Sequence, residues 1–255
     1  MDTQLPKKYK VLLLGDNCTD EYQYGSVDRI SPEAPVPIIN FTHSESKPGM
    51  VGNVRLNLIN LGLDVHMLAS EPGTKTRIID IKSGQQLLRI DRDKHSKPLE
   101  IESLSDVDLA AFNAIVISDY NKGYITYDII RHLRRHYTGP IFLDTKKQEL
   151  DKFYGIYVKI NELEYKSIKS INDQLIVTLG SKGAMLKRYS DEQFLTVPKI
   201  EVTDVCGAGD TFLSSLTYKF LQSGSITAAI NFANRAATIT VQHMGNYAPR
   251  LEEII

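Results

Sequence analysis

The sequence predicts an α/β protein with a mainly parallel central sheet, helices on both faces and a small β lid. First, short apolar runs alternate with amphipathic segments, which is the pattern of β-α-β units. Second, polar residues follow several of these runs, as expected at the strand ends where α/β proteins bind ligands. Third, two β-like segments, about 21–42 and 74–91, interrupt the alternation and are predicted to form the lid.

The composition limits the classes of function. The 255 residues fit one large domain, so we expect residues 1–255 to form a single domain. With 30 basic and 31 acidic side chains the net charge is −1, so neither nucleic acid nor a membrane is an expected partner. No segment approaches the roughly 20 apolar residues that span a bilayer. Cys18 and Cys206 lack metal-site spacing, and the expected location is a reducing cytoplasm.

The first half of the chain contains two core strands, a helix and the lid. The apolar run at 10–15 is a predicted buried strand, and 64–70 is a second. Between them, 49–61 has apolar residues on one helical face and is followed by Gly62, which favours a helix end. Within the second lid segment, Ser83-Gly84 separates two β-like runs and is a plausible hairpin turn.

The second half supplies more strands and a basic amphipathic helix at 127–137. Each of the four apolar runs is short enough to be a core strand; they cover 114–120, 140–145, 156–161 and 174–180. Polar residues at strand ends define the expected site: Asp16 and Asp20, Asp119 to Lys122, Asp144 to Lys147, Asn161 to Glu164, and Thr178 to Gly183.

A glycine turn, DVCGAGDTF at 204–212, precedes a run with helical spacing that Gly224 is expected to end. Small residues at a helix N-terminus let a phosphate approach unpaired backbone N–H groups. Asp210 would repel that anion unless it faces a neutral hydroxyl that must lose a proton. Aspartate is also a common helix N-cap, so these nine residues support a base and a cap about equally.

The wider sequence resembles a known family. The GAGD turn is similar to the C-terminal signature of the ribokinase-like (carbohydrate kinase PfkB) family. Other stretches resemble, within that family, the domain that phosphorylates D-glycero-D-manno-heptose 7-phosphate in ADP-heptose synthesis, a step of lipopolysaccharide precursor biosynthesis. They run in order from about residue 11 to 248: GDNCTDEYQYG, RISPEAPVPI, PGMVGNVRLNLINLG, QQLLRID, ISDYNKG, FLDTKK, NELE, VTLGSKGAM and NFANRAATITV.

The resemblance implies a ribokinase-like three-layer sandwich with a β lid over the sugar. It implies transfer of a phosphoryl group from ATP, with Mg²⁺, to the C1 hydroxyl of the heptose phosphate. By position it makes Asp210 the base and Gly207, Ala208 and Gly209 the anion hole. The nucleotide-binding positions are Asn161, Glu164, Thr178, Gly180, Gly183 and Asn234, with Glu164 holding Mg²⁺ mostly through water.

On the sugar side the resemblance assigns Asp20, Gly49 and Asn53 to substrate hydroxyls. The substrate phosphate needs cations, and Arg89, Lys122 and Lys146 are the candidates. The sequence departs from the family at Met50, where the sugar-side turn usually has a second glycine, and it lacks segments after residue 70 and after NELE. The lid segments are expected to form a homodimer.

Two alternatives to this heptose kinase remain open. The chain could phosphorylate another sugar, such as a hexose phosphate or a nucleoside. It could also be a trimmed, inactive relative that only binds a sugar phosphate or a partner protein. Against the second alternative, a protein that only binds has no chemical need for a carboxylate beside an anion hole.

Overall fold

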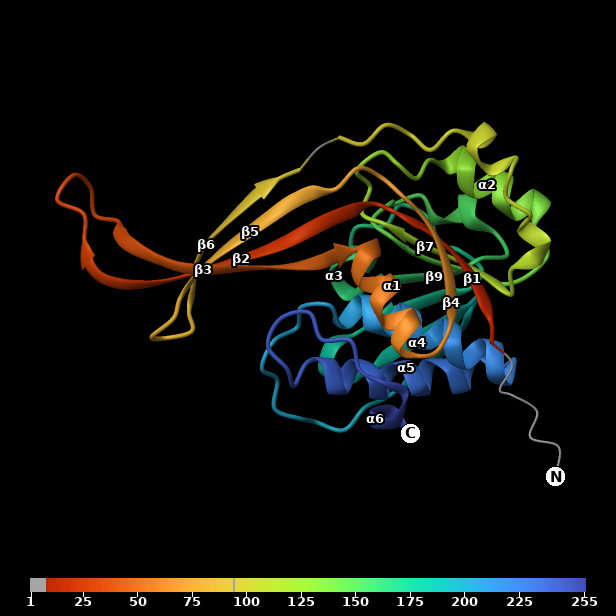
Figure 1. Cartoon of the computed structure of the whole chain (residues 1–255). Helices are drawn as coiled ribbons and strands as arrows, with labels where there is room; N and C mark the ends of the chain where they lie inside the picture. The colour runs from red at the N-terminus through yellow and green to blue at the C-terminus, as the bar shows by residue number, and fades with distance from the viewer. Residues whose placement is uncertain (1–7, 94) are drawn as a thin grey trace, which may run out of the picture.

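The computed structural model describes residues 8–93 and 95–255, and these form two β-sheets with helices packed around the larger one. The larger sheet is the centre of the body. The smaller sheet projects from one side of the body as a long, twisted lid (Figure 1). This arrangement confirms the predicted fold class, an α/β core with a small β lid.

The larger sheet has the strand order β12-β11-β10-β9-β8-β7-β1-β4. Its strands are β1 (Lys10–Gly15), β4 (Asp64–Ala69), β7 (Ala114–Asp119), β8 (Ile141–Thr145), β9 (Tyr157–Asn161), β10 (Leu175–Thr178), β11 (Ala184–Arg188) and β12 (Asp191–Leu195). The strands from β4 to β10 run parallel, so their carboxyl ends lie along one edge. The last two, β11 and β12, are antiparallel.

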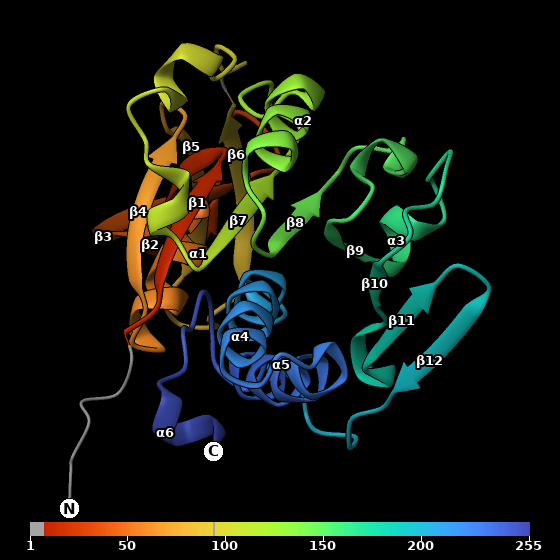
Figure 2. The same ribbon diagram turned by 90° about the vertical axis from the view of Figure 1, so that its right-hand side faces the viewer.

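Helices cover both faces of this sheet, as Figure 2 shows. One face carries α1 (Val51–Asn60), α4 (Ala208–Ser223) and α5 (Ile226–Thr240), with the short α6 (Leu251–Ile254) beside α5. The other face carries α2 (Tyr127–His136) and short 3₁₀ turns at Ile101–Leu104, Leu109–Ala111 and Leu150–Phe153. A further 3₁₀ turn, Gly180–Lys182, follows β10, and the short α3 (Glu162–Tyr165) follows β9.

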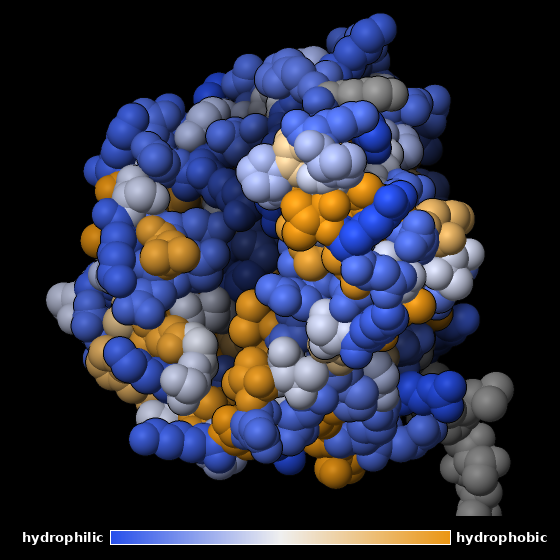
Figure 3. All heavy atoms as spheres, turned by 90° about the vertical axis from the view of Figure 1, so that its left-hand side faces the viewer, coloured by the Kyte–Doolittle hydropathy of each residue, from blue (hydrophilic) through white to orange (hydrophobic). Residues whose placement is uncertain are grey.

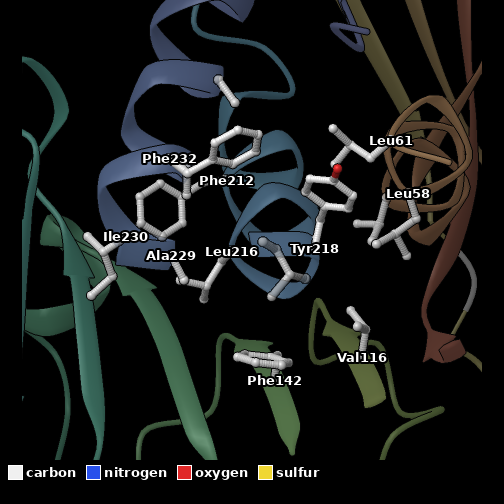
Figure 4. Close-up of a cluster of buried hydrophobic side chains, with 14 of the residues drawn as sticks. Leu58, Leu61, Val116, Phe142, Phe212, Leu216, Tyr218, Ala229, Ile230 and Phe232 are labelled. Atoms are coloured by element: carbon white, nitrogen blue, oxygen red, sulfur yellow. The ribbon is translucent and has the colours of Figure 1, made fainter. Parts of the chain in front are cut away.

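Each face of the sheet has its own apolar core. Figure 4 shows part of the first, where Leu58 of α1, Leu216 of α4 and Ala229 of α5 face the sheet residues Phe142 and Val116. The strands explain this division, because side chains alternate between the two faces. Val11 and Leu13 of β1 belong to this core, while Leu12 and Leu14 belong to the core under α2.

The lid has the strand order β3-β2-β5-β6. Its strands are β2 (Asn17–Ile30), β3 (Pro37–Met50), β5 (Gly73–Asp80) and β6 (Gln86–Arg92). The expected turn at Ser83-Gly84 joins β5 to β6, with Gly84 at φ 70°. β2 begins earlier and β3 ends later in the chain than the predicted 21–42 segment, so that Asp20 and Gly49 belong to the lid sheet.

Two features of the body differ from the sequence expectation or add to it. The antiparallel pair β11–β12 was not predicted, because its run at 191–195 is short and mostly polar. Met50 has φ 50°, a backbone conformation that favours glycine, and its side chain is buried.

In the described part of the chain, no helix combines the length and the apolar character needed to cross a membrane.

Candidate active site

The glycine turn leaves unpaired backbone donors at the start of α4. Gly207 is the N-cap residue, with φ 76°, and the helix begins at Ala208. Among the described residues, the N–H groups of Gly209 and Asp210 have no hydrogen-bond partner. Because the N-terminus also carries the positive end of the helix dipole, these two donors suit an anion.

Asp210 does not cap this helix. It lies in the first turn, and its carboxylate accepts hydrogen bonds from Asn53 Nδ2 at 2.7 Å and from the Tyr120 hydroxyl at 3.2 Å. The capping interpretation is therefore wrong. Burial raises the pKa of Asp210 to about 6, and the nearby Asp144 carboxylate adds to the rise. A pKa in this range suits a general base at neutral pH.

The sugar-side residues meet at the base of the lid. Asp20 is buried, and its carboxylate accepts hydrogen bonds from Arg77 Nη1 of β5 at 2.6 Å and from Asn246 Nδ2 at 3.0 Å. A Cβ at Gly49 would lie 2.3 Å from Asp20 Oδ2, so only glycine fits beside this carboxylate. Asn53 donates to Asp210, and a Cβ at Gly207 would lie 2.9 Å from Asn53 Nδ2 and 3.2 Å from Asn246 Oδ1, so Asn53 and Asn246 lie side by side. The structure therefore brings Asp20, Gly49, Asn53 and Asp210 together.

Two cavities meet at Gly209. One, of about 140 Å³, is polar and is lined by residues that include Asp210, Asn161 and Glu164. The other, of about 210 Å³, is mostly apolar and runs between α5 and the loop before α4. Its lining includes Val197, Val205 and Ala237 together with the predicted nucleotide-binding residues Thr178, Gly180, Gly183 and Asn234. An apolar cleft beside a polar pocket and unpaired N–H donors can accommodate a nucleobase and its phosphates.

Asn161 and Glu164 form a reciprocal capping box on α3. Asn161 Oδ1 accepts from the Glu164 N–H, and Glu164 Oε2 accepts from the Asn161 N–H, both at 2.8 Å. Lys146 Nζ donates to Glu164 Oε1 at 3.0 Å. The NxxE pattern thus has a structural role, and it also fixes both side chains at the wall of the polar cavity.

Asn234 lies in the wall of the apolar cavity but also has a structural contact. Its Nδ2 donates to the Leu195 carbonyl at 2.9 Å, which ties α5 to the end of β12. Gly180 and Gly183 have φ values of 58° and 88°, so the turn between them depends on glycine. A Cβ at Gly183 would lie 2.1 Å from the Leu195 carbonyl oxygen.

The three candidate phosphate cations lie in different places. Arg89 of β6 pairs with Asp91, Lys122 with Asp93, and Lys146 with Glu164 on the polar cavity. The β5–β6 register places Arg89 opposite Arg77, so both project from one side of the lid. Lys75 is on that side too, and its Nζ lies 5.7 Å from the centre of the Tyr120 ring.

Sequence reasoning missed several residues of this region. Arg77 and Asn246 hold Asp20, and Tyr120, which lies within the predicted cluster Asp119 to Lys122 but was given no role of its own, donates to Asp210. A fourth, Lys159 of β9, is buried and forms an ion pair with the partly buried Asp144 of β8 at the polar cavity, with 2.6 Å between Nζ and Oδ2. The sequence does contain a signal for Lys159, because a lysine within the apolar run at 156–161 indicates a buried charge.

Comparison with known protein families gives a match to the pfkB family carbohydrate kinase model over residues 145–253. Among curated relatives, the bifunctional protein HldE of Nitratiruptor sp. is 31% identical, with 97% of this chain and 64% of the relative aligned. The HldE of Hydrogenovibrio crunogenus is 29% identical over 93% of this chain and 60% of its own length. The chain therefore spans less than two thirds of the length of these relatives.

Solved structures share the fold. A ribokinase from Arabidopsis thaliana, complexed with ribose and ATP, aligns with a TM-score of 0.71 and 16% identity over 97% of this chain and 98% of its own. A carbohydrate kinase from Agrobacterium tumefaciens aligns with a TM-score of 0.73 and 18% identity over 96% and 95% of the two chains. Because both identities are low, these structures establish the architecture alone.

Proposed function

We propose that the chain is a carbohydrate kinase of the pfkB family and that it phosphorylates a sugar hydroxyl with ATP; the match to the pfkB model over residues 145–253 and the similarity to the HldE relatives support this. One observation carries the proposal: the Asp210 carboxylate lies beside unpaired N–H donors where the two cavities meet. A phosphate held there has a base within reach of an incoming hydroxyl. Family kinases use ATP, and the apolar cavity next to Gly209 supports a nucleobase at that position.

The chemistry follows from this arrangement. The sugar hydroxyl oxygen forms a bond to the γ-phosphorus and gives its proton to Asp210. The bond from that phosphorus to the β-phosphate oxygen breaks, and ADP leaves with that electron pair. Charge on the moving phosphoryl group is stabilised by the N–H groups of the Gly207-Ala208-Gly209 turn and the helix dipole.

The residues of the polar cavity fit a Mg²⁺ ion that is held by Glu164 mostly through water. Magnesium keeps several waters and uses one or two protein carboxylates together with substrate phosphates. Glu164 presents a carboxylate at this cavity, and its position is fixed by Asn161 and Lys146. When bound, the ion would neutralise charge on the nucleotide phosphates, and Glu164 would hold it mostly through water.

We propose a phosphorylated sugar as substrate, and most specifically the C1 hydroxyl of D-glycero-D-manno-heptose 7-phosphate. The heptose assignment rests on the resemblance of RISPEAPVPI and QQLLRID to heptose kinases. The lid supports the phosphate, because Lys75, Arg77 and Arg89 project from the side of the lid that carries Asp20. Asp20 and Asn53 would bind substrate hydroxyls near Asp210.

We also propose that two copies associate through the lid. Large apolar side chains are exposed on it, including Ile30, Phe41 and Leu88 at 60%, 64% and 53%. Apolar patches interrupt the hydrophilic surface on the side from which the lid projects (Figure 3). A second lid would cover such side chains.

An ATP-consumption assay tests the function. Wild type is given heptose 7-phosphate, fructose 6-phosphate, ribose and a nucleoside, and Asp210→Asn is run beside it. We expect turnover with heptose 7-phosphate and a loss of several orders of magnitude in kcat for the variant, with little change in ATP affinity. Preference for another sugar would replace the heptose assignment. Binding without any turnover would favour the inactive relative.

A further inference from the structure

Lys159 is a buried lysine in the middle of a core strand. Only 4% of the Lys159 surface is exposed to solvent. Its Nζ donates to Asp144 Oδ2, which lies 2.6 Å away on the neighbouring strand. Replacing such a buried ion pair by apolar residues of similar volume is often neutral or stabilising. Fold stability alone therefore gives no reason for a lysine at this position.

The Lys159 ammonium group lies against the turn that starts α4. A Cβ at Gly209 would lie 2.9 Å from Nζ and 3.9 Å from Asp144 Oδ2, so the ammonium group is adjacent to the backbone of Gly209, the residue whose N–H is unpaired. Lys159 also lines the polar cavity together with Asp210 and Glu164. Within the described residues, Asp144 is its one hydrogen-bond partner, which leaves two of its three N–H donors unused.

The positive charge of this lysine is retained despite burial. Burial lowers the pKa of Lys159, but the carboxylates of Asp144, Glu164 and Asp210 outweigh it and raise the pKa above its ordinary value. Lys146, the other cation in the cavity wall, has a side chain that is 46% exposed and is bonded to Glu164. Lys159 is therefore the buried cation of the cavity.

We propose that Lys159 is a catalytic residue that contacts the transferring γ-phosphoryl group, and that Asp144 positions it. This inference rests on the proposed kinase function. Lys159 would donate its two free N–H groups to the phosphoryl oxygens on the side of the Gly209 N–H. The N–H groups of the turn stabilise the negative charge on those oxygens with their dipoles. The buried ammonium group adds a full positive charge to this stabilisation.

The test is Lys159→Met, which keeps the length of the side chain and removes the charge. We expect kcat to fall about a hundredfold, the loss typical of one removed oxyanion donor. Affinity for a non-hydrolysable ATP analogue should fall about tenfold, whereas affinity for ADP should change by less than about twofold. Titration calorimetry measures both affinities, and a merely structural role would not separate ATP from ADP.

Lys187→Met is the matched control. Lys187 is also a strand lysine paired with a carboxylate on the neighbouring strand, Glu192, but it lies outside the polar cavity. We expect it to keep wild-type kcat and ATP affinity. Asp144→Asn, which leaves the lysine without its anchor, should lower kcat about tenfold and leave ADP affinity unchanged.

Three outcomes decide the inference. A folded Lys159→Met variant with kcat within threefold of wild type, or with equal losses for ATP and ADP, overturns it. If that variant does not fold, the double variant Lys159→Met with Asp144→Asn is used, because it leaves no unpaired buried charge. A kcat within threefold of wild type, or equal losses of affinity for ATP and ADP, then overturns the inference in the same way. If wild type phosphorylates no sugar but Lys159→Met still loses ATP affinity selectively, the phosphate contact stands and the proposed function fails.

Discussion

At the scale of single residues, Asp210 combines two properties that oppose each other. Its carboxylate is buried, which costs stability when it ionises, and it is the group that the proposed reaction needs ionised. Asn53 and Tyr120 donate to it and partly offset that cost. The two properties can be separated by pH and by substitution.

The first prediction is a pH profile. Asp210 acts as a base only when it is deprotonated, and its pKa is raised to about 6. We therefore expect kcat/KM to rise about tenfold per pH unit below pH 6 and to level off above it. Steady-state rates from pH 5 to 8.5 at sugar concentrations well below KM measure this, and a flat profile between pH 5 and 7 would contradict the assignment.

The second prediction concerns stability. The pKa of Asp210 is about 6 in the folded state against an ordinary value of 3.8, so the folded state binds the proton more tightly. The free energy of unfolding therefore falls as pH rises from 3.8 to 6, by up to about 3 kcal/mol at about 1.4 kcal/mol per unit. Asp210→Asn removes this cost. We expect it to stabilise the protein by about 1–3 kcal/mol at pH 7.5 and by much less at pH 4.5, measured by urea unfolding.

The third prediction concerns Arg77. We expect Arg77→Met to raise KM for the phosphorylated sugar about 10- to 100-fold, because a charge-assisted contact to the phosphate is lost. A sugar without a phosphate should show no such increase, since the same change frees Asp20 from its ion pair. Comparison of the two KM values decides the point. Equal increases for both sugars would mean that Arg77 serves only to hold Asp20.

A residue that belongs to a local sequence motif can be proposed as a site residue from the sequence. A residue that reaches the site only through strand pairing or long-range folding cannot. Asp210, Asn161 and Glu164 lie next to turns whose glycines or spacing are visible in the sequence. Arg77 is one of several lid cations, and only the strand pairing shows that it faces Asp20. Asn246 is far along the chain from its partner, in a segment without a local signal.

At the scale of elements, α4 has a glycine near each end, and the two have different roles. Gly209 lies in the first turn, beside Lys159 and the polar cavity. Gly224 is the C-cap residue at φ 65°, and a Cβ added there would meet no atom within 4 Å. One is needed for the space it leaves, and the other for its backbone conformation.

The fourth prediction uses this contrast. A methyl group at Gly209 would displace the end of the Lys159 side chain and cover the unpaired N–H groups, so Gly209→Ala should lower kcat at least about 100-fold. Its unfolding free energy should change by no more than about 1 kcal/mol, because alanine favours a helix. Gly224→Ala is the control, with about 1 kcal/mol lost and kcat unchanged. If Gly209→Ala kept full activity, the anion hole would lie elsewhere.

At the scale of the whole molecule, the alternation of strands and helices was enough to predict the architecture. The apolar runs at 114–120 and 140–145 became neighbouring parallel strands, as the β-α-β pattern requires. What the pattern could not give is the order of the strands or the antiparallel end of the sheet. The alignment with the Nitratiruptor relative spans 303 positions for a chain of 255 residues, so that relative has segments that are absent here.

The fifth prediction is the oligomeric state. We expect light scattering to give a dimer for wild type. Replacing Phe41 and Leu88 by glutamate should give a monomer, because a charge on an apolar contact surface opposes association. The matched control is glutamate at Tyr154, which is 69% exposed but lies on the body. A wild-type monomer would contradict the proposed lid contact.

Three of the links that join the lid to the body are very short. β1 passes into β2 through Asp16 alone, β3 passes directly into α1, and β4 and β5 are separated by three residues. These three links leave no slack for a hinge at β2 and β3, whereas the link from Arg92 of β6 to the 3₁₀ turn at Ile101 is longer, so admission of a substrate would involve bending along β2 and β3 themselves. The stiffness of those two strands, including the constrained backbone at Met50, would then set how fast the product escapes.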